Sequence, residues 1–202
     1  MCFSSSLFWR FMPIVHALLF GATAIIGRIL VARKRYHREL SFSNGDSVQD
    51  LVARCFYLWL PIVDGLFLLL SCLTGNRGPV LIAIADREWV RWIGVACMAI
   101  SLASVVVSQA AMGAAWRMGV DLAERTDLVT AGPFAFSRNP IYVGIRGTML
   151  SQLLVFDTWP MLNIWVISEL LVHLQVRFEE AHMRRLHKQR YVDYCARVRR
   201  WL

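Results

Sequence analysis

The sequence predicts an all-α membrane protein, a polytopic bundle of about five transmembrane helices that forms one domain over residues 1–202. Three observations predict this fold. Hydrophobic residues make up 57% of the 202 residues and the mean hydropathy is +0.48, which is too apolar for a soluble domain of this size. Apolar runs long enough to cross a bilayer recur along the chain, and basic residues gather beside their ends. The sequence contains no alternating strand pattern.

The apolar runs place the predicted helices along the chain. The first three spans cover residues 11–31, 55–73 and 90–112. The fourth and fifth, residues 141–156 and 161–176, are near the lower length limit and flank a turn of only four residues. So tight a turn predicts a C-terminal helical hairpin. In the tail, bulky residues recur at helical spacing over residues 178–198, which predicts a helix lying along the membrane surface.

The positive charge follows the span ends. A net charge of +8 is typical of nucleic-acid-binding proteins, but the basic clusters at residues 33–38 and 184–200 each follow a predicted span, so membrane topology explains them and no nucleic acid is expected. Five spans put both clusters on one side, which predicts an outer N-terminus and a cytoplasmic C-terminus in a bacterial inner membrane or endoplasmic reticulum. A cleavable signal peptide ending near residue 24 is the alternative, although the apolar run continues beyond that point.

The five cysteines predict neither a metal site nor disulfides. Their number is odd and the sequence contains no Cys-x-x-Cys pair. We therefore expect free thiols that fill space between helices.

Two polar motifs interrupt the apolar C-terminal half. In LVTAGPFAFSRNPIYVG, residues 128–144, Asn139 is predicted as the N-cap and Pro140 as the first residue of a helix. The free N–H groups of that helix start and the Arg138 guanidinium predict an anion-binding site. A plain helix cap, with Arg138 reaching lipid phosphates, is the alternative. Glu179 and Glu180, alone more typical of a solvated helix face, lie at the same predicted membrane face, which favours one shared site.

Together these motifs carry a family resemblance. The pattern LVT-x-GPF-x-x-x-RNP-x-Y-x-G, followed by a span, the glutamate pair and Y-x-x-Y-x-x-x-V, resembles the isoprenylcysteine carboxyl methyltransferase family, whose wider group includes membrane phospholipid methyltransferases. The resemblance covers about residues 116–201. It implies a cytoplasmic S-adenosylmethionine site within residues 116–202. The residues that the resemblance assigns to this cofactor are Thr126, Asp127, Leu128, Val129, Phe134, Arg138, Asn139, Pro140, Ile141, Tyr142, Glu179 and Glu180.

One residue departs from the family pattern, since family members usually have histidine where this chain has Asn139. Asparagine keeps the capping role but cannot carry a positive charge, so a cofactor carboxylate would depend more on Arg138 and the helix start. Because adjacent helix positions diverge by about 100°, only one of Glu179 and Glu180 is expected to face the cofactor.

The fifth predicted span carries ionisable residues on one face. Glu169, His173 and Arg177 recur at a spacing of four, and we expect Arg177 to lie nearest the cofactor. The alternative is a structural relay between Glu169, His173 and a neighbouring span, with Arg146 or Asp64 as a partner. On the third span, a stripe of small residues at positions 101, 104 and 108 predicts close helix packing.

The resemblance implies methyl transfer to a lipophilic acceptor drawn from the membrane. For a carboxylate of the isoprenylcysteine type no base is needed, and Arg177 would orient the acceptor. For the amine of a phospholipid, or a hydroxyl, Glu169 or His173 would be the base. A catalytically inactive membrane protein of the same fold is the third hypothesis.

Overall fold

The computed structural model describes residues 2–36, 48–75, 78–81, 87–115 and 127–202. Over these residues the regular structure is helical, apart from an isolated antiparallel bridge between Val80 and Thr158. This confirms the predicted all-helical class. The elements, in order, are α1 (Cys2–Phe20), η1 (Gly21–Gly27), α2 (Arg28–Tyr36), α3 (Val48–Trp59), η2 (Leu60–Asp64), α4 (Gly65–Thr74), α5 (Glu88–Met112), η4 (Gly113–Ala115), η5 (Gly132–Ala135), α6 (Pro140–Phe156), α7 (Trp159–His187) and α8 (Gln189–Arg197).

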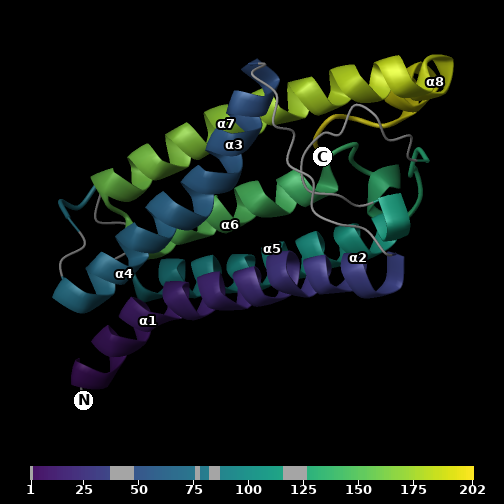
Figure 1. The fold of residues 1–202 in the computed structure, drawn as a ribbon. Helices are drawn as coiled ribbons and strands as arrows, with labels where there is room; N and C mark the ends of the chain where they lie inside the picture. Colours follow the sequence, from purple (N-terminus) through teal and green to yellow (C-terminus); the bar gives the residue numbers. More distant parts are fainter. Residues whose placement is uncertain (1, 37–47, 76–77, 82–86, 116–126) are drawn as a thin grey trace.

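A helix occupies each of the five predicted spans. Four stretches within the described residues have the length and apolarity to cross a membrane: Phe11–Arg35, Val48–Thr74, Glu88–Met112 and Trp159–His187. The fifth, α6, has only 17 residues, about 26 Å at 1.5 Å per residue. It packs between α5 and α7 in the middle of the bundle (Figure 1).

The last span is longer than the sequence predicts. A helix ending near residue 176 is expected, but α7 continues without a break to His187 and has 29 residues. The reason is local, because residues 177–187 contain no glycine or proline and are rich in arginine, glutamate and other strong helix formers. Glu179 and Glu180 therefore lie within the continuous helix α7 rather than in a separate tail helix.

The contact between α5 and α6 depends on small residues, as predicted. A Cβ added at Gly144 would lie 2.5 Å from Val105 Cγ2 and 2.9 Å from the Ser101 carbonyl oxygen. Ser101 and Ser108 are both buried on the facing side of α5. The backbones of the two helices thus approach more closely than larger side chains permit.

The predicted hairpin of α6 and α7 is also present. Asp157 ends α6 in the left-handed conformation, with φ of 44°, and α7 begins two residues later. The Asp157 carbonyl accepts a hydrogen bond of 2.9 Å from the Leu81 N–H, and the Trp159 N–H donates to the Pro79 carbonyl at 3.1 Å. The turn is thereby tied to the segment that precedes α5.

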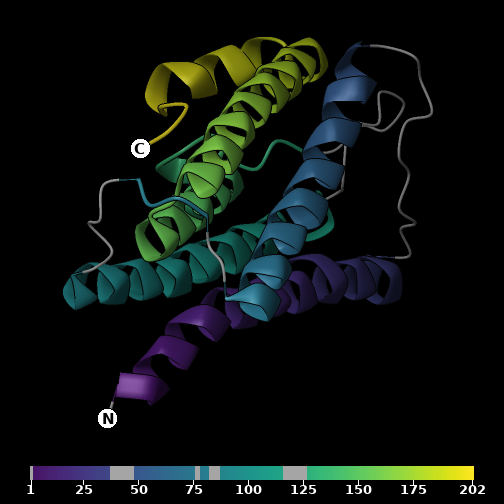
Figure 2. The same ribbon diagram turned by 90° about the vertical axis from the view of Figure 1, so that its left-hand side faces the viewer.

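The remaining helices surround this hairpin. The α1–η1–α2 rod crosses α5, while α3 packs beside α7 and α4 packs against α1 (Figure 2). His16 on α1 makes a hydrogen bond of 3.1 Å with the Met98 carbonyl of α5, a structural role. The chain starts at one end of the bundle, and α8 folds beside α7 at the opposite end (Figures 1 and 2).

Candidate functional site

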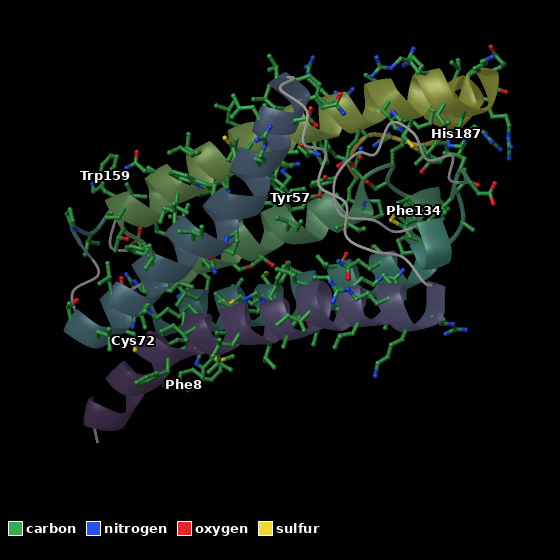
Figure 3. The ribbon with its side chains drawn as sticks, in the orientation of Figure 1. Phe8, Tyr57, Cys72, Phe134, Trp159 and His187 are labelled. Carbon is green, nitrogen blue, oxygen red and sulfur yellow. The ribbon has the colours of Figure 1, made fainter. Side chains whose placement is uncertain are left out.

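A cavity opens at the end of the bundle where α7 passes into α8, and we call it the α7–α8 cavity. The empty space in it, counting the part that is open to solvent, amounts to about 870 Å³. Phe134 in its wall and His187 at the end of α7 lie at the same end of the bundle, whereas Trp159 marks the other end of α7 (Figure 3). The residues that line it are Met112, Ala115, Asp127, Leu128, Val129, Phe134, Arg138, Asn139, Pro140, Ile141, Tyr142, Glu179, Glu180, His182, Met183, Tyr191 and Tyr194.

Every residue that the sequence assigns to the cofactor and that the structure describes lines this cavity. Thr126 lies outside the described residues. The residues that line the cavity are up to 82 positions apart in the chain, from Met112 to Tyr194. The α6–α7 hairpin brings their segments together because its two ends meet at one end of the bundle.

Arg138 is held in place by the end of the chain. Its Nε donates to Glu180 Oε1 at 3.2 Å, and its Nη1 donates to the carbonyls of Cys195 and Val198, each at 3.2 Å. Its backbone N–H donates to the Arg199 carbonyl at 2.9 Å. The C-terminal tail therefore fixes the arginine that the sequence predicts to attract an anion.

Glu180 is the centre of this network. Its Oε1 accepts from Arg138 and from Asn139 Nδ2, the latter at 3.1 Å. Its Oε2 accepts from Nε and Nη2 of Arg200 at 3.0 and 2.7 Å. These hydrogen bonds raise the pKa of Arg200 above its ordinary value. The Glu180 side chain is only 11% exposed. Its carboxylate is paired with two guanidinium groups, those of Arg138 and Arg200.

Glu179 points to another wall of the cavity. Its Oε1 accepts from the Tyr142 hydroxyl at 2.5 Å and from Gln175 Nε2 at 2.9 Å. Both glutamates line the cavity, so the expectation that only one would do so is wrong. Adjacent positions do diverge around α7, but the cavity wall extends from the start of α6 to α8 and includes both directions.

Asn139 is at the N-cap position of α6, as predicted, but its side chain does not cap the helix. Its amide instead donates to Glu180 Oε1 and to the Arg200 carbonyl, the latter at 3.2 Å. Ser137 Oγ accepts the Asn139 N–H at 3.1 Å. The amide is drawn away from the helix start because α7 and the tail each supply one acceptor, the Glu180 carboxylate and the Arg200 carbonyl.

Two tyrosines of α8 complete the cavity. The Tyr194 hydroxyl donates to the Phe134 carbonyl at 2.7 Å, and burial raises the pKa of Tyr194 to about 12. Burial also raises the pKa of Tyr191. Both phenols are therefore neutral hydrogen-bonding groups at physiological pH. Their i, i+3 spacing on the apolar face of the tail is the sequence signal for this position.

Sequence reasoning did not assign Met112, Ala115, His182 or Arg200 to the site. Met112 and Ala115 are apolar residues at the end of an apolar helix, with no local signal for a cavity. Arg200 is one of several basic residues in the tail, and nothing in their spacing indicates which of them reaches Glu180.

The predicted acid–base and acceptor residues lie away from the cavity. Arg177 is exposed and does not line it, contrary to the expectation that this arginine is nearest the cofactor. The neighbouring Gln175 and Val176 are fully buried, so these two residues face the bundle and Arg177 faces away from it. Glu169 and His173 also do not line the cavity.

Glu169 and His173 instead make the contacts with a neighbouring span and with each other that the alternative interpretation expects. Arg146 Nε of α6 donates to both Glu169 oxygens, at 2.9 and 2.8 Å. His173 Nδ1 lies 2.8 Å from the Glu169 carbonyl oxygen and 3.6 Å from Glu169 Oε2. Asp64 is not part of the relay, since it accepts from Gln152 at 3.1 Å.

The comparisons with known proteins agree with this architecture. The fold is similar to that of the eukaryotic intramembrane Ras methyltransferase (isoprenylcysteine carboxyl methyltransferase), with a TM-score of 0.59 and 18% sequence identity. The match covers 90% of this chain but 61% of that chain, so this chain spans less than two thirds of the length of the solved protein. With its apolar helices, this fold is that of a multi-pass membrane protein.

A comparison with proteins of curated function finds no match. The family model described as phospholipid methyltransferase matches residues 89–190, half of the chain, and includes α6, α7 and most of the α7–α8 cavity. This chain therefore belongs to the phospholipid methyltransferase family.

Proposed function

We propose that the protein is an S-adenosylmethionine-dependent methyltransferase that acts on a lipophilic acceptor taken from the membrane. The observation that carries the proposal is the α7–α8 cavity, in which three separate segments, residues 127–134, 138–142 and 179–183, present their polar groups to one space. Family membership supports the same reaction class.

The donor set of the cavity fits this cofactor. S-adenosylmethionine carries a carboxylate, an ammonium, ribose hydroxyls and an adenine ring. Arg138 and the start of α6 offer positive charge, which suits the carboxylate. Glu179 offers negative charge for the ammonium, and Phe134 and Leu128 offer apolar surface for the adenine.

When bound, the cofactor supplies an electrophilic methyl group on a sulfonium. The protein's own contribution is to position the reactants and to exclude water. Tyr142 and Gln175 fix the Glu179 carboxylate, so that it need not reorganise on binding. Glu180 and the tail carbonyls do the same for Arg138, and Tyr191 and Tyr194 cover the cavity on the α8 side.

The acceptor we favour is a carboxylate of the isoprenylcysteine type, the group named for the protein of similar fold. A carboxylate is ionised at neutral pH and needs no base. An acceptor that needs no base fits this cavity, because the two candidate bases, Glu169 and His173, do not line it. The phospholipid amine is the second candidate, and the family model favours it. On either reading the cofactor side of the bundle is cytoplasmic, in a bacterial inner membrane or endoplasmic reticulum.

Cofactor binding to the purified protein in nanodiscs tests the proposal. Wild type should bind S-adenosylmethionine, and Glu179→Gln should weaken binding by about 1.5–3 kcal/mol, because a charge-assisted hydrogen bond is lost. Glu88→Gln, at the exposed start of α5, is the matched control and should leave the affinity unchanged. Calorimetry or dialysis with labelled cofactor gives both values.

Transfer of the labelled methyl group to a prenylcysteine carboxylate or to a lipid amine then identifies the acceptor. Transfer should rise with the length of the acceptor's tail, since each buried CH₂ adds about 0.8 kcal/mol. Absence of cofactor binding by the wild type, or an unchanged affinity in Glu179→Gln, would contradict the proposal.

A further inference from the structure

A second polar site lies outside the α7–α8 cavity, and we call it the Arg146 cluster. It consists of Arg146 on α6, Glu169 and His173 on α7, and Trp201 in the C-terminal tail. The Trp201 ring centre lies 4.5 Å from the guanidinium carbon of Arg146 and 5.3 Å from the His173 ring centre. The tail thus covers one face of a charged group that belongs to a membrane-embedded helix.

The guanidinium of Arg146 is only partly used by the protein. Nε makes both hydrogen bonds to Glu169, at 2.9 and 2.8 Å. Among the residues that the structure describes, Nη1 and Nη2 have no hydrogen-bond partner, and the side chain is 32% exposed. Four N–H donors of this partly exposed side chain therefore make no hydrogen bond to the described residues.

Arg146 lies within the fourth span that the sequence predicts, residues 141–156, where unpaired polar groups are costly. Arg146 is six residues after Pro140, the first residue of α6, and so about 9 Å along the helix. Charged side chains at such positions usually serve a ligand or a pathway rather than stability alone. A planar guanidinium with two free terminal nitrogens matches a carboxylate or a phosphate.

The Arg146 cluster is next to the cavity. Tyr142, one helical turn before Arg146, lines the cavity and packs in a group of apolar residues that Trp201 contacts. One turn of helix is about 5.4 Å. An anionic group held at Arg146 would therefore lie about one helical turn from the cavity wall.

We propose that Nη1 and Nη2 of Arg146 bind the anionic group, a carboxylate or a phosphate, of the lipophilic acceptor as it arrives from the bilayer. Glu169 is then the internal counter-ion that neutralises Arg146 when no acceptor is bound, and Trp201 orients the guanidinium plane. This assignment rests on the proposed function, whose acceptor it locates. It replaces Arg177, which is exposed and does not line the cavity.

The two members of the ion pair should act in opposite directions on anion binding. Removing the charge of Arg146 takes away the donors. Removing the charge of Glu169 takes away the anion's competitor and leaves Arg146 positive. An ion pair that served only to stabilise the fold would instead give a similar loss in both variants, because each leaves a charge unpaired.

Three radiolabelled probes of equal chain length test this in detergent solution: palmitate, palmitoyl lysophosphatidic acid and uncharged monopalmitoylglycerol. Arg146→Gln should weaken binding of the anionic probes about ten- to a hundredfold and leave the uncharged one unchanged. Glu169→Gln should strengthen anion binding severalfold. The anionic probe that responds tells whether a carboxylate or a phosphate is recognised. Arg91→Gln is the matched control, since Arg91 also lies over a tryptophan ring, that of Trp9 at 5.8 Å.

Arg146→Lys keeps the charge without the planar donors, so it should bind the anionic probes with intermediate affinity even where Arg146→Gln folds poorly. Unchanged anion binding in Arg146→Gln, or a loss in Glu169→Gln as large as that in Arg146→Gln, would overturn the assignment. Cofactor affinity, measured on the same samples, should be that of wild type, because Arg146 does not line the cavity. If the wild type binds no cofactor, the proposed function is refuted. The binding of the lipid probes still decides whether Arg146 forms an anion site.

Discussion

Asn139 shows at the residue scale how one side chain connects the motif, helix α7 and the tail. The family resemblance leads one to expect a histidine here, and the amide makes two contacts that a neutral histidine could not both donate in the same way. It donates to Glu180 Oε1 at 3.1 Å and to the Arg200 carbonyl at 3.2 Å. Both hydrogen bonds therefore require a neutral side chain that donates at position 139.

Replacing Asn139 by aspartate should be strongly destabilising. The change removes both donated hydrogen bonds and places a second carboxylate beside Glu180, which we expect to cost about 2–4 kcal/mol. Thermal unfolding in detergent measures the loss. Asn163→Asp is the matched control, because Asn163 is exposed and donates only to the carbonyl four residues before it. Equal stability of the two variants would show that the Asn139 network contributes little.

At the scale of elements, the contact of α5 with α6 positions the site, because α6 begins at the motif and ends at the hairpin. Gly144 is two residues after Tyr142 and faces Val105 and the Ser101 carbonyl at distances that exclude a side chain. Backbone atoms cannot move aside as a flexible side chain would. Any side chain at this position must therefore push the two helices apart.

Gly144→Ala should lower stability by about 1–3 kcal/mol through overpacking and should also weaken cofactor binding, since the start of α6 shifts. Gly65→Ala in α4 is the control, because a Cβ there meets no atom within 4 Å. Alanine is the better helix former, so this variant should be as stable as wild type or slightly more so. Scanning calorimetry compares the two; a Gly144→Ala protein as stable as Gly65→Ala would contradict the close contact.

At the scale of the whole molecule, the basic residues gather at one end of the bundle. The basic ends of α2 and α7 and the helix α8 lie opposite the N-terminus (Figure 1). The α7–α8 cavity opens at that basic end. Because cytoplasmic ends of membrane proteins are enriched in lysine and arginine, we expect the cavity to face the cytoplasm.

Cysteine labelling of sealed vesicles tests this orientation, in a background whose five native cysteines are replaced by serine. An impermeant reagent applied from outside should label Val80→Cys, which lies beside the α6–α7 turn, and should not label Arg35→Cys or Arg190→Cys until the membrane is opened. Labelling of Arg190→Cys in sealed vesicles would reverse the topology and place the cofactor site outside.

The sequence by itself determined the helical membrane class, the positions of the spans and the hairpin, and the family resemblance whose described cofactor residues now line the cavity. The class, the spans and the hairpin follow from local patterns: apolar runs, a short turn, a proline after an N-cap residue, and small residues on one face of a helix. Family membership and the matching fold agree with that reading.

Only the tertiary structure decided which charges meet. The chain has 22 lysines and arginines and 14 acidic residues, and their spacing does not say that Arg138 and Arg200 share Glu180 or that Arg146 pairs with Glu169. Nor does it say that Arg177, on the same predicted face as Glu169 and His173, is exposed and does not line the cavity. Helical spacing specifies directions around one axis, whereas a partner's place depends on how long α7 extends, how closely α5 and α6 approach, and where the tail returns. These are properties of packing between segments far apart in the chain, and a local pattern carries no information about them.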